Sequence, residues 1–499
     1  MEKEKRDIET IERYSVKTEE ITIEVSIKGE QGKSIFYYIT IPKISRATLA
    51  LVDEIRKDLI AEVKISAEEM LDPREAEKTK EKFKQKASTM LDEKITLEPG
   101  IKKILITLLM NEMLGLGEIE FLLSDANLEE ISISTSFEPI RVYHKKYGWL
   151  DTNIMIKSEE QIMNYATIIA RRAGRQISAL SPILDAHLIT GDRANAILYP
   201  VATKGNSITI RKFARDPWTI IDFINYGTIT SKLASIIWIA MQYEMTILVS
   251  GGTGSGKTSF LNVIMPFIPF NQRIVTIEQT RELQLPSYLH WVPMVTRLPN
   301  PEGKGEVNML DLMVNSLRMR PDRIVLGEIR RREEAEVLFE AIHTGHSVYA
   351  TVHADTLNET IKRLVNPPIS VPENLLETVN LCVTMFRDRR KGIRRVYQVG
   401  EFIYGEESEG SKVKPNLLFR YKPIEDKIVP HAKSLTLFDN ISRITGMSMQ
   451  EINKDMNEKE QILDAMAKQK IRSLEEVGKI MNDYYINKDR VLKLLKIKR

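Results

Sequence analysis

A glycine-rich segment in the middle of the chain constrains the fold more than any other part of the sequence. Residues 251–259 read Gly-Gly-Thr-Gly-Ser-Gly-Lys-Thr-Ser. They follow a short apolar run at 246–249 and precede an apolar-periodic segment that begins at Phe260. This is the pattern G-x-x-x-x-G-K-[ST] between a strand and a helix, the setting of a phosphate-binding loop in an α/β protein. Nucleotide binding is therefore the first hypothesis.

The chemistry of a triphosphate explains these residue types. Glycines let the backbone N–H groups converge on phosphate oxygens, and the following helix N-terminus adds a partial positive charge. Lys257 should contact the β and γ phosphates, and the Thr258 hydroxyl should be a ligand of Mg²⁺. The alternative is a glycine-rich turn before a helix, but pattern and context together favour the phosphate loop. The predicted nucleotide-binding residues are Gly251, Gly252, Thr253, Gly254, Ser255, Gly256, Lys257, Thr258 and Ser259.

Length and composition indicate a globular protein of more than one domain. A chain of 499 residues exceeds the size at which one core usually keeps growing, so two or three domains are expected. Hydrophobic residues make up 42% and charged residues 28%, which excludes a disordered or membrane-embedded chain. The net charge of +3 predicts no dominant field for nucleic acid, so no direct nucleic-acid partner is expected.

Targeting and redox signals are few. The longest apolar stretches, such as 234–241, are too short to cross a bilayer. The N-terminus lacks the apolar centre of a secretory signal, so we expect a cytoplasmic protein. The single cysteine, Cys382, excludes internal disulfides and a cysteine-rich zinc site, and it should be a small core residue.

Strand and helix patterns before residue 214 predict an α+β domain behind a more variable region. The first hundred residues show β-like segments and a charged helical stretch without a chemical motif. From about residue 111, strand patterns dominate around one clear helix. The expected strands are 21–27, 34–41, 131–134, 140–143, 149–151, 194–198 and 207–211, and the expected helices are about 67–94 and 159–172.

Beyond residue 230, alternating strand and helix patterns predict a parallel sheet covered by helices. Pro217, Gly227 and weak periodicity suggest a hinge before it. The expected strands are 246–249, 273–277, 323–326 and 348–352, and the expected helices are 310–319 and 332–344. The predicted parts are an N-terminal region 1–109 without a motif, an α+β domain 110–213, a hinge 214–230, a nucleotide-binding α/β domain 231–436 and a helical tail 437–499.

Hydrolysis needs carboxylates beside the loop, because a phosphate loop binds nucleotide without activating water. Glu278 follows the apolar run 274–277, and Glu328 follows 324–327. In an α/β sheet the ligand lies outside the carboxyl ends of the strands, so both should face the γ-phosphate. Glu328 resembles a Walker B acid that holds Mg²⁺ directly or through water, and Glu278 is the better candidate to orient the attacking water. The alternative for each is that it only caps a loop.

Basic residues complete the candidate site. His353 ends the run 348–352 and should emerge at the same sheet edge as a γ-phosphate sensor, with a packing role as the alternative. Arg193 and Arg211 lie before the hinge and could swing toward the phosphates, where an arginine contributes on the order of 10³ to 10⁵ in rate. Ordinary surface arginines are the alternative. The run 387–395 is most simply a solvated hairpin turn, with nucleic-acid or acidic-lipid contact as the alternative.

Four motifs in this order resemble the secretion ATPase superfamily that powers type II secretion, type IV pili and the archaellum. They are the phosphate loop, the acidic box 276–280, the Walker B-like segment 320–330 and the histidine box 345–354. The resemblance covers roughly residues 110–400. Segments 181–186 and 363–368 look like the archaeal branch, and a single cysteine excludes the tetracysteine zinc insertion of bacterial type II members. One departure is Gln279, where the family commonly has aspartate.

The resemblance implies a motor. Six identical chains would form a ring whose subunits clamp ATP and Mg²⁺ between an N-terminal domain and a RecA-like domain, with a hinge near Pro217. Arg193 and Arg211 match arginines that the family brings to the nucleotide. The ring would sit on the inner face of an archaeal membrane, dock beneath a polytopic platform protein and drive pilin-like subunits into a filament.

Three other functions stay open. The ring could be the archaellum assembly and rotation motor, or a conjugative type IV secretion ATPase. From a different class, the chain could be a nucleotide-gated scaffold that binds ATP and hydrolyses it negligibly, because Gln279 replaces a carboxylate.

Overall fold

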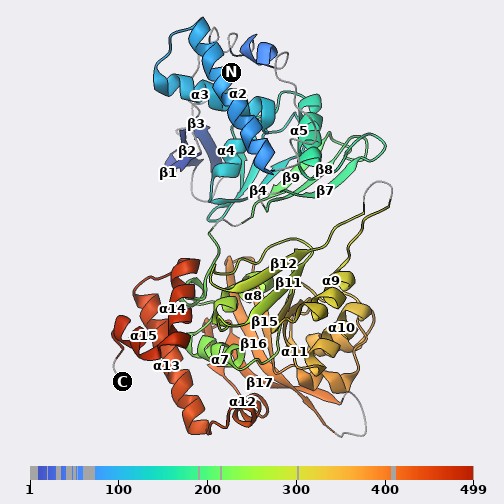
Figure 1. The fold of residues 1–499 in the computed structure, drawn as a ribbon, viewed down its shortest axis with the longest axis vertical. Helices are drawn as coiled ribbons and strands as arrows, with labels where there is room; N and C mark the ends of the chain where they lie inside the picture. Colours follow the sequence, from blue (N-terminus) through green and yellow to red (C-terminus); the bar gives the residue numbers. More distant parts are fainter. Residues whose placement is uncertain are drawn as a thin grey trace. The chain divides into compact units, whose positions relative to one another are not determined.

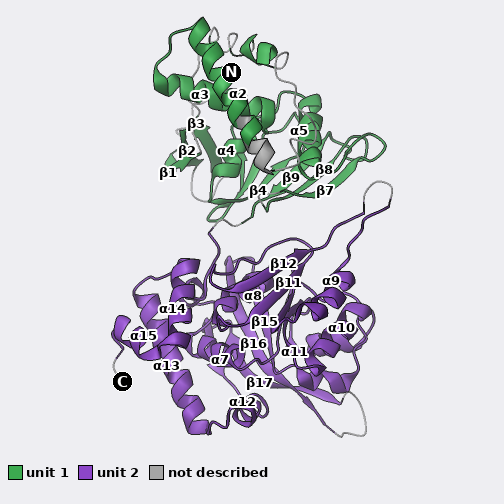
Figure 2. Ribbon diagram, in the orientation of Figure 1, with its two compact units in different colours: residues 1–215 green, residues 216–499 purple. Residues whose placement is uncertain are grey.

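The chain forms two compact units, Met1–Arg215 and Asp216–Arg499 (Figure 2). The computed structural model describes residues 9–18, 21–29, 35–40, 48, 52, 54–59, 73–188, 191–213, 216–299, 303–405 and 412–497. The first unit therefore ends inside the expected hinge 214–230. The other expected domain boundaries, at 109 and 436, stay predictions.

In the described part of unit 1, nine strands form one sheet in the order β1-β2-β3-β6-β5-β4-β9-β8-β7 (Figure 1). Among the described strands of this sheet, only β3 and β6 pair in parallel. Buried and exposed residues alternate, as in β8, where Ala194 and Ala196 are buried and Arg193 is exposed. One face of such a sheet packs on the core and the other meets solvent. The strands are β1 (Thr10–Lys17), β2 (Thr22–Gly29), β3 (Ile35–Thr40), β4 (Leu128–Ile133), β5 (Arg141–His144), β6 (Gly148–Thr152), β7 (Ile183–His187), β8 (Arg193–Ile197) and β9 (Ser207–Arg211).

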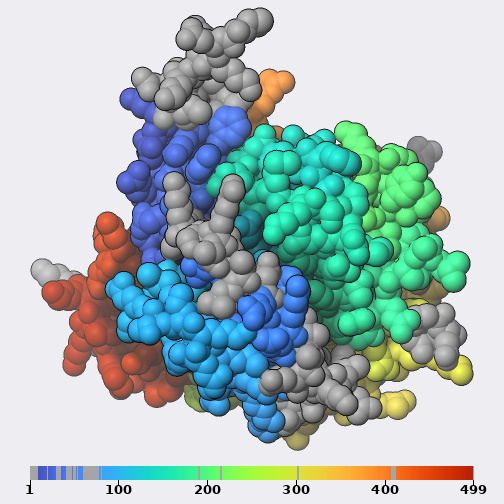
Figure 3. All heavy atoms as spheres, turned by 90° about the horizontal axis from the view of Figure 1, so that it is seen from above, coloured from blue at the N-terminus to red at the C-terminus, as the bar shows by residue number. Residues whose placement is uncertain are grey.

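Three strands from the first hundred residues, β1, β2 and β3, belong to this sheet. Tyr37 of β3 lies opposite Thr152 of β6. Tyr14 and Tyr37 donate hydrogen bonds of 2.7 Å and 2.9 Å to one carboxylate oxygen of Asp125, whose side chain is buried. In Figure 3 these dark-blue strands share one face with the teal segment around residues 150–170. The N-terminal strands therefore extend the α+β domain.

Helices cover unit 1, and the best-defined of them matches its predicted range. In α5 the Ser158 side chain accepts the N–H of Gln161, with acidic residues in the first turn and basic residues in the last. Such a cap and charge order stabilise a helix at both ends. The expected helix at 67–94 is described from residue 73 on. The helices are α2 (Pro73–Lys94), α3 (Pro99–Leu114), α4 (Ile119–Ser124) and α5 (Glu159–Arg172).

Unit 2 has a RecA-like α/β fold. Its described strands follow the order β12-β11-β13-β14-β10-β15-β16-β17-β18 (Figure 1). Neighbours from β12 to β15 are parallel, which confirms the expected parallel sheet, and β15 to β18 are antiparallel. β10 is buried along its whole length, as in a strand covered on both faces. The strands are β10 (Ile247–Gly251), β11 (Arg273–Glu278), β12 (His290–Val295), β13 (Arg323–Leu326), β14 (Ser347–Val352), β15 (Leu381–Asp388), β16 (Ile393–Tyr404), β17 (Val413–Lys422) and β18 (Lys427–Pro430).

The helices of unit 2 begin inside the expected hinge. Ile220 and Ile221 of α6 are buried in the core of unit 2, so the described chain from residue 216 on belongs to this unit. Cys382 is buried in β15, as expected. The helices before the tail are α6 (Ile220–Asn225), α7 (Ser231–Gln242), α8 (Lys257–Ile264), α9 (Met309–Ser316), α10 (Arg332–His343) and α11 (Leu357–Val365).

The helical tail packs on α7 and shares its core. The Trp238 ring stacks on Phe267 at 5.2 Å, meets the Tyr484 ring edge-on and donates a 2.8 Å hydrogen bond to the Tyr485 hydroxyl. No helix in the described residues is both long enough and apolar enough for a bilayer crossing. The tail helices are α12 (Leu437–Thr445), α13 (Met449–Lys468), α14 (Leu474–Ile486) and α15 (Lys488–Leu494).

Candidate functional site

The glycine-rich loop joins the central strand β10 to α8, as its pattern predicts. β10 ends at Gly251, and α8 begins at Lys257. Gly254 and Gly256 have φ angles of +72° and +94°, a region that favours glycine because it has no Cβ. A Cβ on Gly252 would lie 2.7 Å from an Asp355 carboxylate oxygen. The loop is therefore shaped by glycine and by close neighbours.

The Lys257 ammonium lies inside this loop. Its Nζ donates to the carbonyl oxygens of Gly251 at 2.9 Å and of Gly252 at 3.1 Å. Burial lowers the pKa of Lys257, and the negative charges of Glu328, Asp355 and Glu282 oppose that shift. The lysine thus stands where the loop backbone would surround a phosphate, with carboxylates close enough to act on its charge.

Neighbouring strand ends bring His353 and Glu328 to the same sheet edge. Ser250 of β10 lies opposite Val352 of β14, so the next residue, His353, emerges beside the loop. Its Nε2 lies 2.9 Å from the Thr253 hydroxyl oxygen. Glu328 follows β13, and Arg330 binds its carboxylate at 2.7 Å. Of the sequence-predicted groups, His353 therefore has a direct contact with the loop.

Glu278 is the last residue of β11 and is only 2% exposed. Its Oε1 accepts the backbone N–H groups of Glu282 at 2.9 Å and Leu283 at 3.1 Å. Its Oε2 is buried and has no hydrogen-bond partner among the residues that the structure describes. Burial raises the pKa of Glu278 to about 7. One oxygen therefore caps a loop, which was the alternative expectation, and the other is buried at the end of β11.

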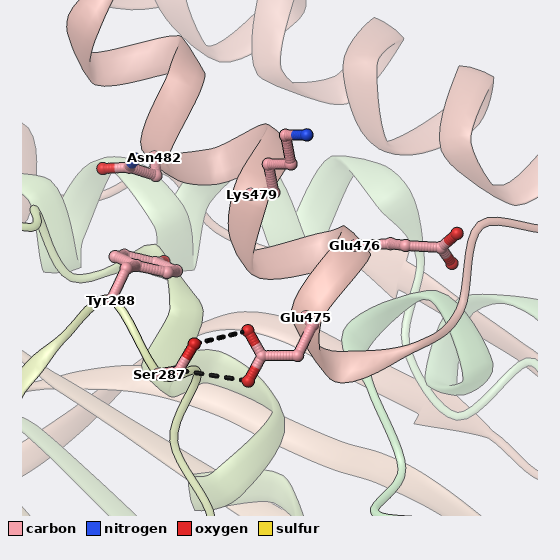
Figure 4. Close-up of a pocket in the computed structure, with 6 residues that line it drawn as sticks. All are labelled: Ser287, Tyr288, Glu475, Glu476, Lys479 and Asn482. Carbon is pink, nitrogen blue, oxygen red and sulfur yellow. Dashed lines mark hydrogen bonds between the residues drawn. The ribbon is translucent and has the colours of Figure 1, made fainter.

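The loop 279–289 that Glu278 caps is held by two other parts of unit 2. The Gln284 N–H donates to the Asn262 side chain of α8 at 2.8 Å. The backbone N–H and hydroxyl of Ser287 both donate to the Glu475 carboxylate of α14, at 3.1 Å and 2.9 Å (Figure 4). Loop 279–289 thus links the phosphate-loop helix, Glu278 and the helical tail.

A shallow cavity of about 320 Å³ lies beside this contact (Figure 4). Its walls come from loop 279–289 and from α14, and none of its lining residues belongs to the phosphate loop. A Cβ on Gly478 would lie 2.7 Å from the Pro286 ring, so the helix approaches the loop closely here. The cavity is lined by Ser287, Tyr288, Glu475, Glu476, Lys479 and Asn482.

Sequence reasoning missed two arginines of the site. The run 387–395 does form the expected turn between β15 and β16, where Arg387 and Arg394 are cross-strand partners. The Arg394 Nε donates to the Gly254 carbonyl at 3.1 Å, and an Arg387 nitrogen lies 2.7 Å from where a Gly254 Cβ would stand. The register of the hairpin is the signal that would have placed both residues on one face.

Arg193 and Arg211 are described within unit 1. They are exposed cross-strand partners on β8 and β9, so both side chains lie on one face of the sheet. Arg193 binds both oxygens of Asp185, at 3.1 Å and 2.7 Å. The two arginines therefore lie side by side on the same face of the sheet of unit 1.

The residues at the loop fit a magnesium ion that arrives with nucleotide. Mg²⁺ takes oxygen ligands and is commonly held by one or two carboxylates together with phosphates. The Thr258 hydroxyl lies in the first turn of α8, and the Glu328 carboxylate acts on the neighbouring Lys257. In the described parts of the chain, no group of three His, Cys, Asp or Glu side chains forms a self-contained metal site.

The sequence of this chain is similar to those of known proteins. A sequence model of the family described as "Type II/IV secretion system protein" matches residues 148–388. An uncharacterized protein of Methanocaldococcus jannaschii is 34% identical over 411 residues, which are 81% of this chain and 74% of the relative. The type IV secretion system protein PtlH of Bordetella pertussis is 30% identical over 286 residues, 51% of this chain and 84% of PtlH.

A solved structure matches as well. The VirB11 ATPase of the Brucella suis type IV secretion system, crystallised with sulphate, is 26% identical and has a TM-score of 0.29. The match covers 57% of this chain and 92% of the VirB11 chain. The sequence relatives and the family match carry the assignment. The chain belongs to the type II/IV secretion system ATPase superfamily.

Proposed function

We propose that this protein is an ATP-hydrolysing motor. The observation that carries the proposal is the 2.9 Å contact between His353 and Thr253, because it places the histidine box directly on the phosphate loop. Glu328 and Glu278 follow strands of the same sheet edge, where ligands of α/β proteins bind. A phosphate loop with a buried base and a polar sensor is what nucleotide hydrolysis requires.

Each side chain takes a distinct part in this reaction. Lys257 binds the β and γ phosphates, and Glu278, with a pKa near 7, accepts a proton from the attacking water at neutral pH. Thr258 and Glu328 would hold Mg²⁺, which would neutralise phosphate charge when bound. His353 senses the γ-phosphate from the end of β14. Arg387 and Arg394 add positive charge beside Gly254.

The motor function follows from the family. We propose a ring of six identical chains in which Arg193 and Arg211 approach the nucleotide, so that hydrolysis moves the two units relative to each other. The ring would act on the cytoplasmic side of an archaeal membrane through a polytopic platform protein and assemble type IV pilus-like filaments from pilin-like subunits. The similarity to a Methanocaldococcus jannaschii protein supports the archaeal setting.

Nucleotide binding tests the first step. Titration with a fluorescent ADP analogue should give saturable binding for the wild type and a loss of about 100-fold or more for Lys257→Ala, because the lysine supplies a buried charge to phosphate. Lys479→Ala removes an exposed lysine of α14 and should bind like the wild type. Equal affinity in all three proteins would refute the site.

Type IV secretion is the second candidate, because PtlH is a type IV secretion system protein and is 30% identical. Deletion of the gene in its host separates the two functions. Loss of surface filaments, seen by electron microscopy, supports filament assembly, whereas intact filaments with lost protein or DNA export support secretion. Loss of swimming with retained pili would instead identify an archaellum motor. Nucleotide binding without turnover would identify the scaffold.

A further inference from the structure

We infer that Arg330 and Gln279 form a latch in which Arg330 occupies Oε2 of the Glu328 carboxylate and competes with Mg²⁺ for that oxygen. The Arg330 guanidinium bridges the two residues: Nε and Nη2 donate to Glu328 Oε2 at 2.9 Å and 2.7 Å, and Nη1 donates to Gln279 Oε1 at 2.5 Å. This inference rests on the proposed function of Glu328 as a magnesium ligand. It assigns a positioning role to Arg330 and Gln279, which sequence analysis left without one.

The base of the latch is rigid. The buried Glu334 carboxylate accepts the backbone N–H groups of Arg330 at 2.9 Å and Arg331 at 3.1 Å. The backbone of Ile329 donates to the Thr351 carbonyl of β14. The main chain at 329–331 is therefore held by hydrogen bonds to β14 and to the side chain of Glu334 in α10.

The head of the latch faces solvent. The Arg330 side chain is 52% exposed and the Glu328 side chain 26% exposed. An arriving ion can therefore compete with the guanidinium for the same carboxylate oxygen. Arg330 must release Glu328 Oε2 before that oxygen can bind a cation, because both positive groups need the same lone pairs.

The neutral charge of Gln279 sets how firmly the latch closes. The Gln279 amide oxygen accepts a hydrogen bond from the guanidinium and orients it, but it carries no net charge. Glu328 therefore remains the anionic partner of Arg330 in the latch. A carboxylate at position 279 would be a second anionic partner and would divide the guanidinium between two acids. Gln279 therefore favours the closed latch, and an acidic residue would favour the open one.

The expected effect is modest and measurable. An ion pair with this exposure contributes up to ~1 kcal/mol, which is about fivefold in an equilibrium constant. Mn²⁺ replaces Mg²⁺ as the probe, and its affinity for the ADP-bound full chain is measured by electron paramagnetic resonance. Arg330→Gln should tighten Mn²⁺ binding about fivefold, Gln279→Glu by a similar factor, and Gln279→Ala about twofold because it removes the anchor without adding charge.

A double-mutant cycle separates the latch from general electrostatics. In a Glu328→Gln background, Arg330→Gln should leave the Mn²⁺ affinity unchanged, because the group that it frees is gone. A gain of the same size in both backgrounds would show a long-range charge effect and overturn the latch. Arg332 lies two residues after Arg330 and forms an exposed ion pair with Glu336. Arg332→Gln breaks that pair and serves as the matched control, with no change in Mn²⁺ affinity expected. Gln469→Glu at the end of α13 is the control for Gln279→Glu.

The latch and the proposed function fail in different ways. Binding of the fluorescent ADP analogue without metal should be equal in the wild type, Gln279→Ala and Arg330→Gln, because the latch acts only on the cation ligand. A wild type that binds no ADP would refute the nucleotide site itself. Normal ADP binding with unchanged or weaker Mn²⁺ affinity in Arg330→Gln would overturn the latch and leave the nucleotide site standing.

Discussion

Replacement of Glu278 by glutamine should make unit 2 more stable at high pH while it removes the proposed base. Burial raises the pKa of this carboxyl from 4.5 to about 7. The folded state therefore binds the proton more tightly than the unfolded state. The wild type loses stability as the pH rises from about 4.5 to about 7, and the loss is complete above that range. Glutamine cannot ionise, and its side-chain oxygen can still accept the N–H groups of Glu282 and Leu283.

The magnitude follows from this interval. About 2.5 pH units at ~1.4 kcal/mol each set an upper limit of ~3.5 kcal/mol, of which about 2.5 kcal/mol develops between pH 5 and pH 8. In Glu278→Gln the amide NH₂ group would be buried in place of Oε2. An unsatisfied buried amide lowers the free energy of unfolding by about 1 to 3 kcal/mol at every pH. The quantity to measure is therefore how the difference in free energy of unfolding between Glu278→Gln and the wild type changes with pH.

Urea unfolding of the full chain at pH 5 and pH 8 gives this quantity, with pulse-labelled hydrogen exchange of peptides from β10 and β13 to follow unit 2 alone. The free energy of unfolding of Glu278→Gln relative to the wild type should rise by about 2.5 kcal/mol between the two pH values. Glu306→Gln, an exposed carboxylate of the same unit, should show almost no change. A constant difference for Glu278→Gln, within about 0.5 kcal/mol, would mean that burial does not oppose ionisation of this residue.

Three further changes test other contacts of unit 2. Gly256→Ala should lower the free energy of unfolding by about 1 kcal/mol and weaken nucleotide binding, because φ is +94° at this position; calorimetry and nucleotide titration check both effects, and wild-type values would contradict the strain argument. Arg394→Ala should weaken binding of the fluorescent ADP analogue about fivefold, because the Gly254 carbonyl loses its hydrogen bond from Arg394. Arg389→Ala, at the exposed hairpin tip, should leave binding unchanged. Equal effects of the two changes would refute a specific contact. Gly478→Val should lower the free energy of unfolding by about 1 to 3 kcal/mol and speed hydrogen exchange at Ser287, because the new Cβ would meet Pro286 at 2.7 Å. Lys479→Ala is the control. Unchanged exchange in Gly478→Val would show that α14 does not hold loop 279–289.

The sequence predicts best those elements whose pattern reflects burial. β13 and β9 have the expected ranges, and α5 carries both its cap and its charge order in the local sequence. β1 was harder to predict because it is mostly exposed, so its residues follow no apolar alternation. The two units meet at 215/216, inside the expected hinge 214–230, but α6 in that range was not predicted because it is short and its burial depends on the rest of unit 2.

The same distinction applies to the site: residues at the ends of buried strands could be predicted, and residues brought together by long-range contacts could not. The phosphate loop, His353 and Glu328 could be placed from sequence because they follow strands of one parallel sheet, and such strand ends meet at one edge. Arg394 reaches Gly254 across 140 positions of sequence, and Arg330 reaches Gln279 across 51. Contacts of this kind depend on hairpin register and side-chain reach, which no local pattern encodes.

Phosphate release from ATP and Mg²⁺ by the full chain tests the central claim most directly. The wild type should turn over, and Lys257→Ala and Glu278→Ala should each lose about 100-fold or more, because the first removes the phosphate-binding charge and the second the base. Lys479→Ala should keep the wild-type rate. Turnover of the wild type no greater than that of Lys257→Ala and Glu278→Ala would contradict the account.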